Sequence, residues 1–396
     1  MIDVLVIGGG PSGLTLAILL IEAGCNVKVL ESRTVVGEHS RAIGIHPPGL
    51  DVLHRAGIGD AALANGVRIC RGIGISRGRI VAELEFGSIP SSHRFVLSLP
   101  QNRTVELLRQ RLHGLDPTAL MLGTEFLSLA THKEFITAQA VGPNGVVKTF
   151  DCHFLIGADG TRSSVREEAL VPFQGSELSD RYIMGDYPDG TDFGAVAALF
   201  LHTQGITESF PLPRNKRRWV CWVGTRETAS LPELVARRTG HQVNAEENTM
   251  LSRFTTQEFS VGAMAHGNVV LIGDAAHEIS PIGGQGMTLG LVDAAELAPL
   301  LVAALNGAGP RRRLDDQFSR FSALRLAAAR RAARQARLNM RLGRPLWGPS
   351  IGLRDALARA VFSSKPVTAW VASTFTMTRD QSKYRHQARV DGSDAP

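Results

Sequence analysis

The sequence predicts an α/β protein with three parts: a domain that opens with a βαβ unit, an antiparallel β-sheet inserted into that domain, and a helical C-terminal region. Three observations predict this fold. A strand–helix–strand pattern opens the chain within residues 2–31, β-rich alternating runs fill residues 177–224, and helical patterns dominate beyond residue 286. The 396 residues allow one large or two ordinary domains. The boundaries we assign are 1–72, 98–172 and 262–305 for the discontinuous first domain, 73–97 and 173–261 for the inserted sheet, and 306–396 for the helical region.

The first element is a buried strand at residues 3–7, and the loop Gly8-Gly9-Gly10-Pro11-Ser12-Gly13 follows it at once. Residues 14–22 are helical, Gly24 ends this helix, and residues 27–30 form a second strand that ends at Glu31. The first glycine of such a unit permits a tight turn, the second lets the backbone approach a pyrophosphate, and the third lets the helix pack on the strand. Glu31 lies about 20 residues further on, where it can accept a hydrogen bond from a ribose 2′-hydroxyl. The unit therefore predicts a dinucleotide with a free 2′-hydroxyl, FAD or NAD rather than NADP, and no second fingerprint of this kind follows a later strand.

A second signal begins with an apolar run at residues 269–272, which ends in Gly273 and Asp274. The loop Pro281-Ile282-Gly283-Gly284-Gln285-Gly286-Met287 follows, and a helix opens at about its last residue. A carboxylate at a strand end can accept hydrogen bonds from a polyol, and a helix N-terminus favours an anion. Reduced flavin has both a polyol and a delocalised anionic end, so this stretch indicates a flavin.

The inserted sheet is predicted from strand-like runs at residues 73–86, 95–97, 196–201 and 218–223. One side of this sheet should cover the cofactor and form a mainly apolar substrate pocket. The candidate residues that line the pocket are Phe200, His202, Phe210, Pro211 and Trp222. After the second signal, residues 289–304 form a helix that Asn306 and Gly307 end, and residues 343–349 break the helical region that follows.

Composition narrows the class of protein. Hydrophobic residues make up 44% of the chain and charged residues 20%, which is typical of a globular protein with a sizeable core. The four cysteines form no Cys-x-x-Cys, which indicates reduced thiols in a cytoplasmic protein and no metal site. We expect no signal peptide and no integral membrane association, because residues 2–7 already form a strand and no uncharged run is long enough to span a bilayer.

The net charge of +6 comes largely from arginines on a helical pattern between residues 311 and 344. A solvated helix face explains this pattern, and so does a basic surface that attracts a nicotinamide dinucleotide or acidic lipid. Interleaved aromatic residues are missing there, so nucleic-acid binding is not expected.

Together with a third stretch, Gly157-Ala158-Asp159-Gly160-Thr161-Arg162-Ser163-Ser164-Val165-Arg166, these motifs make the chain resemble the single-component FAD-dependent aromatic hydroxylases. These are the para-hydroxybenzoate hydroxylase-like flavoprotein monooxygenases. The resemblance covers at least the first 300 residues and implies a Rossmann-like FAD-binding domain of the GR2 type. Where the family often has asparagine after the position of Met287, this chain has Thr288, whose hydroxyl can still donate a hydrogen bond to the flavin pyrimidine edge but with a shorter reach.

The resemblance implies roles for individual residues. Ser12 and its loop would meet the pyrophosphate, Glu31 the adenosine ribose and Asp274 the ribityl chain, while Asp159 would help both FAD and NAD(P)H binding. The implied FAD-binding set is Gly8, Gly10, Pro11, Ser12, Gly13, Glu31, Ser32, Arg33, Arg41, Gln101, Phe126, Asp159, Gly273, Asp274, Pro281, Gly284, Gln285, Gly286, Met287 and Thr288. The candidates for catalysis beside the flavin ring are Arg41, His46 and Pro281, whereas His277 is interpreted as a structural histidine.

By this resemblance, NADPH or NADH reduces the flavin, and O2 then forms a C4a-hydroperoxyflavin. That species hydroxylates an aromatic, quinone-like or polyketide-like small molecule, and the protein would be a monomer or a homodimer. Three alternatives stay open: a prenyl-chain reductase of the same fold, a flavin-dependent halogenase, and a non-enzymatic flavin-bound redox sensor. The halogenase is disfavoured because Trp219-Val220-Cys221-Trp222 has the wrong spacing for its Trp-x-Trp-x-Ile-Pro motif.

Overall fold

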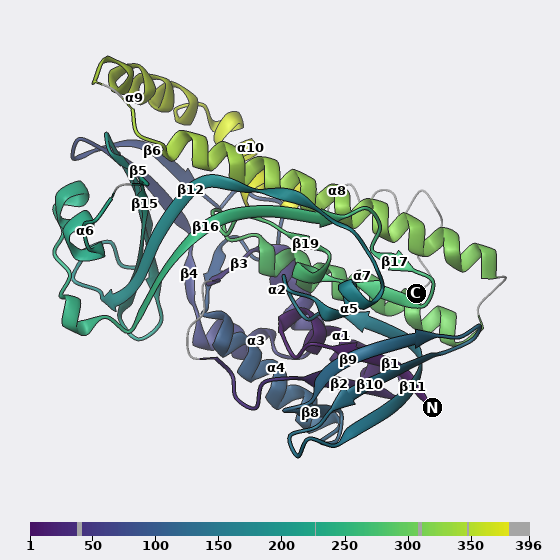
Figure 1. Cartoon of the computed structure of the whole chain (residues 1–396). Helices are drawn as coiled ribbons and strands as arrows, with labels where there is room; N and C mark the ends of the chain where they lie inside the picture. The colour runs from purple at the N-terminus through teal and green to yellow at the C-terminus, as the bar shows by residue number, and fades with distance from the viewer. Residues whose placement is uncertain (38–41, 226, 308–310, 347, 380–396) are drawn as a thin grey trace.

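The computed structural model describes residues 1–37, 42–225, 227–307, 311–346 and 348–379, and it arranges them as two large β-sheets with helices packed along them (Figure 1). The first sheet has eight strands and contains the N-terminal βαβ unit. Its strand β1 (Ile2–Ile7) pairs in parallel with β2 (Val27–Glu31) on one side and with β11 (Val147–Gly157) on the other, and helix α1 (Pro11–Glu22) connects β1 to β2. The other strands are β8 (Leu120–Leu122) and β18 (Val269–Leu271), which are parallel to β2 and β11, and the antiparallel β9 (Glu125–Thr131), β10 (Ile136–Val141) and β17 (Ala265–His266).

The parallel strands place the predicted motifs at one edge of the first sheet. Because β1, β2, β11 and β18 run in the same direction, their carboxyl ends lie side by side. Glu31 is the last residue of β2, and the glycine loop, Asp159 and Asp274 follow the ends of β1, β11 and β18. The local strand–loop–helix patterns and the parallel pairing together therefore bring the three sequence motifs into one region.

The second sheet also has eight strands, in the order β19-β16-β12-β15-β14-β13-β5-β6. All its neighbours are antiparallel except β13 and β5, which pair in parallel. The two longest strands, β12 and β16, run from this sheet to the first domain (Figure 1). The bounds are β5 Arg71–Ser76, β6 Arg79–Glu85, β12 Phe173–Pro188, β13 Ala197–His202, β14 Gly205–Leu212, β15 Lys216–Val223, β16 Met250–Val261 and β19 His277–Glu278.

A small third sheet changes one predicted assignment. Strand β7 (Val96–Ser98) pairs with β3 (Gly44–Ile45) and β4 (Val67–Ile69), and not with the inserted sheet to which residues 96–97 are assigned above. Leu97 is fully buried in the core of the first domain. A three-residue apolar run has no periodicity that distinguishes the two sheets, so its partner is decided by tertiary packing.

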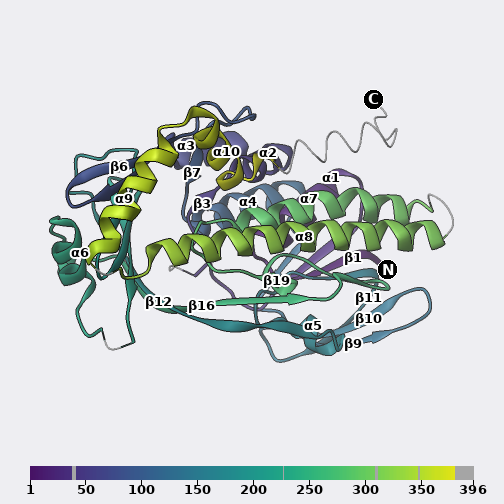
Figure 2. The ribbon, with the colours of Figure 1, turned by 90° about the horizontal axis from the view of Figure 1, so that it is seen from above.

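The helices that cover the first domain and frame the site come from distant parts of the chain. Helix α7 (Gly286–Leu305) packs on α1, and α8 (Arg311–Gly343) runs alongside α7 (Figure 2). Helices α9 (Gly348–Phe362) and α10 (Lys365–Phe375) both contact β6. The remaining helices are α2 (Pro47–Arg55), α3 (Gly59–Asn65), α4 (Gln101–Leu115), α5 (Ser164–Glu168) and α6 (Leu231–Thr239).

The C-terminal half contains one apolar helix and one arginine-rich helix. Helix α7 is long and apolar enough to cross a membrane by length and composition, and it is the one such helix in the described residues. It is not an uncharged run, because it contains Asp293 and Glu296. Its Leu289, Leu291 and Leu297 are fully buried, as in the core helix of a globular protein. The arginines of α8 are also not one uniform solvated face, because Arg325 is only 4% exposed and Arg337 is paired with Glu258.

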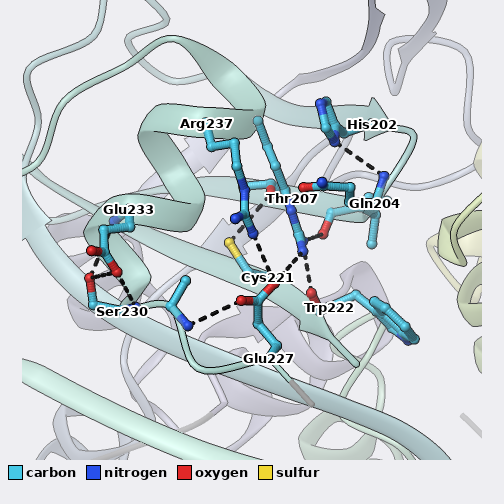
Figure 3. A network of polar contacts seen from close by, with 12 residues as sticks. His202, Gln204, Thr207, Cys221, Trp222, Glu227, Ser230, Glu233 and Arg237 are labelled. Atoms are coloured by element: carbon cyan, nitrogen blue, oxygen red, sulfur yellow. Dashed lines mark hydrogen bonds and ion pairs between the residues drawn. The ribbon is translucent and has the colours of Figure 1, made fainter. Parts of the chain in front are cut away.

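Helix α6 is fixed to the outer face of the second sheet by polar contacts (Figure 3). Ser230 and Glu233 form a capping box at its start, and Gly240 ends it with a left-handed φ of 80°. The Arg238 guanidinium donates to the carbonyl oxygen of Trp222 at 2.7 Å. This face of the sheet is therefore occupied by protein, which leaves the opposite face for a ligand.

Candidate functional site

A cavity of about 1370 Å³ lies between the carboxyl edge of the first sheet and the inner face of the second. Pockets for single small molecules are usually about 300–1,000 Å³. The cavity is therefore large enough for a dinucleotide and a second organic molecule. Predicted residues that line it are Gly8, Gly10, Pro11, Ser12, Glu31, Ser32, Arg33, His46, Gln101, Phe126, Asp159, Phe210, Asp274, Pro281, Gly284, Gly286 and Met287.

The glycines of the first loop have different structural roles. Gly8 has a φ of 109°, and a Cβ there would lie 2.4 Å from the carbonyl oxygen of Ala158. A Cβ at Gly13 would lie 2.1 Å from the carbonyl oxygen of Gly8, so this glycine serves helix–strand packing and does not line the cavity. A Cβ at Gly10 would meet nothing within 4 Å. The space in front of Gly10 is open, and α1 begins there without a side-chain cap, which is the arrangement that receives a phosphate.

Glu31 stands at the cavity wall and holds the glycine loop. Its carboxylate accepts the N–H of Gly9 at 2.7 Å and the N–H of Arg33 at 2.9 Å. A carboxylate offers about four lone-pair sites. Two acceptor sites therefore stay available for a ribose hydroxyl.

Asp159 and Arg166 belong to the second motif. Asp159 Oδ2 accepts the N–H of Val165 at 3.1 Å, while Oδ1 is buried and has no partner among the residues that the structure describes. Burial raises the pKa of this carboxyl. Arg166 donates to the carbonyl oxygens of Thr161 and Ala275, which ties the second motif to the third. The sequence motif contains Arg166, but its position alone gives no sign of this bridging role.

A buried ionic triad supports the third motif from behind. Asp293 accepts hydrogen bonds from His277 Nε2 at 2.7 Å, from Arg325 Nε at 2.6 Å and from the N–H of Gly273 at 3.0 Å. Burial alone would raise the pKa of Asp293, but the neighbouring His277 and Arg325 cations lower it. Burial would lower the pKa of His277, and Asp293 outweighs this and raises it. His277 is thus bonded to a carboxylate, and sequence reasoning missed Asp293 because it lies in a helical pattern 20 residues from Gly273.

Asp274 points from the end of β18 into the cavity, and the triad fixes the glycine before it. The side chain is open to the cavity but surrounded by protein beyond it. Burial in these surroundings raises its pKa, although the nearby His277 acts to lower it, and Asp293 contributes a smaller increase. A carboxylate in this position needs hydrogen-bond donors, which a polyol supplies.

The N-terminus of α7 opens onto the same cavity. Gly283 and Gly284 have φ values of 104° and 67°, and the helix begins at Gly286 without a side-chain cap. The Gln285 side chain instead donates to the carbonyl oxygen of Phe375 at 2.9 Å. The first-turn N–H groups of Gly286 and Met287 therefore face a space suited to an anionic group.

Several predicted cofactor residues lie behind the cavity wall and do not line it: Gly13, Gly273, Gln285 and Thr288. Thr288 is fully buried, and its Oγ1 accepts the N–H of His46 at 3.1 Å. The Thr288 hydroxyl therefore positions the chain before α2 and does not line the space expected for the flavin pyrimidine. Arg41, a candidate for both catalysis and FAD binding, lies outside the described residues.

His46 lines the cavity but is almost completely buried. Its Nε2 lies 3.0 Å from the carbonyl oxygen of Gly283, and its ring meets Phe375 edge-on at 5.2 Å. Burial lowers its pKa to about 4, although hydrogen bonds to the carbonyl groups of Gly283 and Gly284 act in the opposite direction. The imidazole is therefore neutral at physiological pH and holds the glycine loop before α7.

Four of the five predicted substrate residues do not line the large cavity. Phe200 and His202 face α6 and line a separate cavity of about 430 Å³. Pro211 follows Phe210 on the same strand and therefore points to the opposite face, whereas Phe210 lines the large cavity. Trp222 lies beyond the cavity, with its Nε1 donating to Asp180 at 3.0 Å. Successive side chains of a strand point to opposite faces, and β13 to β15 are largely buried on both faces, so their pattern does not indicate which face meets the cavity. The residues of these three strands that line the large cavity are Ala197, Leu199, Leu201, Ile206, Glu208, Phe210, Arg218 and Val220.

Metal ligands are not grouped in the described part of the chain: it has no cluster of three or more His, Cys, Asp or Glu side chains suited to a metal ion. The four cysteines, all within that part, are free thiols.

Comparison with known proteins relates most of the chain to flavoproteins. A family model described as an FAD binding domain matches residues 1–336. The 6-methylpretetramide 4-monooxygenase of Streptomyces rimosus is 32% identical over 324 residues, which are 79% of this chain and 58% of that protein. The match to this chain covers only 58%, 64% and 65% of the lengths of three such relatives.

Two solved structures share the fold. The p-nitrophenol 4-monooxygenase of Pseudomonas putida matches with a TM-score of 0.85 and 21% identity, over 95% of this chain and 98% of that one. The anhydrotetracycline hydroxylase of Streptomyces rimosus matches with a TM-score of 0.76 and 27% identity, over 95% of this chain and 76% of that one.

Proposed function

Because this chain belongs to the family of FAD-dependent aromatic hydroxylases with an FAD binding domain, we propose that it is an FAD-dependent monooxygenase. It would hydroxylate an aromatic, quinone-like or polyketide-like small molecule, with NADH or NADPH as electron donor and with O2. The observation that carries the proposal is a single cavity that joins the glycine loop, Asp274 and the start of α7 to an apolar sheet face.

The residues present fit FAD. The open space before Gly10 and the uncapped start of α1 suit the pyrophosphate, and the remaining acceptor sites of Glu31 suit the adenosine ribose. Asp274 would hold the ribityl chain, and the N–H groups of Gly286 and Met287 would meet the pyrimidine. Asp159 Oδ1 is a buried acceptor with no hydrogen-bond donor among the described residues, and a donor group of FAD would satisfy it.

When bound and reduced, FAD would supply the activation of O2, one atom of which is transferred to the substrate while the other leaves as water. The protein contributes position, electrostatics and exclusion of water. The start of α7 carries roughly half a positive charge, which stabilises negative charge at the pyrimidine. The apolar face of β13 to β15 would hold an aromatic ring over that site and keep water away from it. A cytoplasmic location agrees with the four free thiols.

The test is to follow NADH and NADPH oxidation and O2 consumption together, with flavin-loaded protein and a panel of one- to four-ring phenols and quinones. We expect at least one compound to accelerate both rates and to gain one oxygen atom by mass spectrometry. Acceleration of NAD(P)H oxidation without O2 consumption would indicate a reductase. If no compound accelerates NAD(P)H oxidation by protein that retains its flavin, the result would favour the redox sensor and contradict the hydroxylase proposal.

A further inference from the structure

Glu208 is a buried carboxyl on the side of the second sheet that faces the large cavity. It lies on β14, is 7% exposed, and lines the large cavity together with Ile206 and Phe210 of the same strand. Its direct cross-strand neighbours are Leu199 on β13 and Val220 on β15, which also line the cavity. The carboxyl is therefore set in an apolar wall.

The described residues supply no counter-charge for Glu208. Arg218 lies on the same face, but its guanidinium is bound to both oxygens of Asp186, at 2.6 and 2.8 Å. Glu208 takes part in none of the ion pairs or side-chain hydrogen bonds among the residues that the structure describes. The other titratable groups that sense its charge are Tyr182 on β12 and Cys221 on β15, and both are neutral, with pKa values raised by their own burial.

A buried carboxyl without a partner costs free energy, so a fold alone gives no reason to keep one. Burial raises the pKa of Glu208 to about 7, so near neutral pH the group readily gains or loses a proton. Perturbed carboxyls in cavities are typical of functional sites. The hydroxyl of Tyr182 is buried without a hydrogen-bond partner among the described residues, so it does not satisfy the carboxylate either.

We propose that Glu208 binds the substrate by accepting a hydrogen bond from, and then the proton of, a phenolic hydroxyl on a ring that lies against β13 to β15. This inference rests on the proposed function and names the group of the substrate that the site recognises. In the transfer, the O–H bond breaks, its electron pair stays on the ring oxygen, and the carboxylate becomes a neutral carboxylic acid. The resulting phenolate ring is richer in electrons, which favours attack on an electrophilic oxygen.

The test compares 2-naphthol with 2-methoxynaphthalene, which has no hydroxyl proton, as ligands of the flavin-loaded protein. Binding is measured by the change in flavin absorbance. Wild-type protein should prefer the naphthol about 10- to 100-fold, because a hydrogen bond to a charged group is worth about 1.5–3 kcal/mol. This preference should increase as the pH rises through about 7, where Glu208 ionises. Glu208→Gln should lose most of the preference and its pH dependence.

The matched control is Glu85→Gln, a change of an exposed carboxyl on β6 of the same sheet that does not line the cavity, and it should behave like wild type. The temperature of thermal unfolding gives a second test of the role of Glu208. The raised pKa means that ionisation opposes folding as the pH rises, so Glu208→Gln and Glu208→Leu should unfold at the same temperature as wild type or higher above pH 7. A purely structural role predicts lower midpoints for both.

The assignment is overturned if Glu208→Gln discriminates between the two naphthalenes as wild type does, or if wild type shows no preference for the hydroxyl compound. Either result is distinct from failure of the proposed function. That failure appears instead as no aromatic compound accelerating NAD(P)H oxidation with O2 uptake.

Discussion

Replacing Asp293 by asparagine tests the buried triad behind the flavin motif. In the native protein Asp293 accepts from Arg325, His277 and the N–H of Gly273. Asparagine keeps the volume but removes the negative charge, and it turns one oxygen into an NH2 group that faces another donor. The buried guanidinium of Arg325 then loses the negative charge to which it is bonded in the native protein.

The expected magnitude follows from this geometry. Breaking a buried ion pair by removing one partner costs about 3–5 kcal/mol. With an unfolding entropy of about 2.1 cal/mol/K per residue, 396 residues give about 0.8 kcal/mol/K. The midpoint of thermal unfolding should therefore fall by about 4–6 °C.

The assay is thermal unfolding by circular dichroism with a fixed concentration of FAD, because bound cofactor shifts the midpoint. Asp60→Asn is the control, since that side chain is 99% exposed and should shift the midpoint by less than about 1 °C. A fall of less than about 1 °C for Asp293→Asn as well would refute the claim that the triad stabilises the fold.

The same variant gives a pH dependence with a definite sign. The folded pKa of Asp293 is lowered, so its contribution is present above the ordinary value of 3.8 and is lost as the pH falls through the folded pKa. The folded pKa of His277 is raised, so its contribution is present below the ordinary value of 6.5 and is lost as the pH rises through the folded pKa. The difference between wild type and variant should be largest between these two ordinary values.

Three further changes address the cofactor site. Gly13→Ala should lower the thermal unfolding midpoint of the apoprotein, because its Cβ would lie 2.1 Å from the carbonyl oxygen of Gly8. Gly10→Ala should leave that midpoint unchanged and lower the flavin content, because its Cβ would meet nothing within 4 Å. Equal midpoints for the two variants would contradict this distinction. Asp274→Ala should yield protein with far less bound flavin by absorbance, and full occupancy would exclude the ribityl role. Glu31→Ala should weaken FAD more than FMN in equilibrium dialysis, and equal weakening would argue against a ribose contact.

The sequence by itself predicted the cofactor end of the site because its signals are local. Glycine spacing, a strand before the loop and a helix after it specify a turn and an N-terminus without reference to distant residues. In the structure, Gly8 and Gly13 each lie so close to a backbone carbonyl oxygen that a Cβ would clash with it. The parallel order of β1, β2, β11 and β18 then collects the motifs at one edge.

Tertiary structure alone decided which sheet face lines the cavity and which buried ion pairs support the flavin motif. Strands β13 to β15 are buried on both faces, so the alternation of apolar residues does not indicate which face meets the cavity. The packing of α6 on one face settles this, and it places Phe200 in that core and Glu208 toward the cavity. The Asp293–Arg325 pair depends in the same way on two helices meeting, and no periodicity within either helix contains that information.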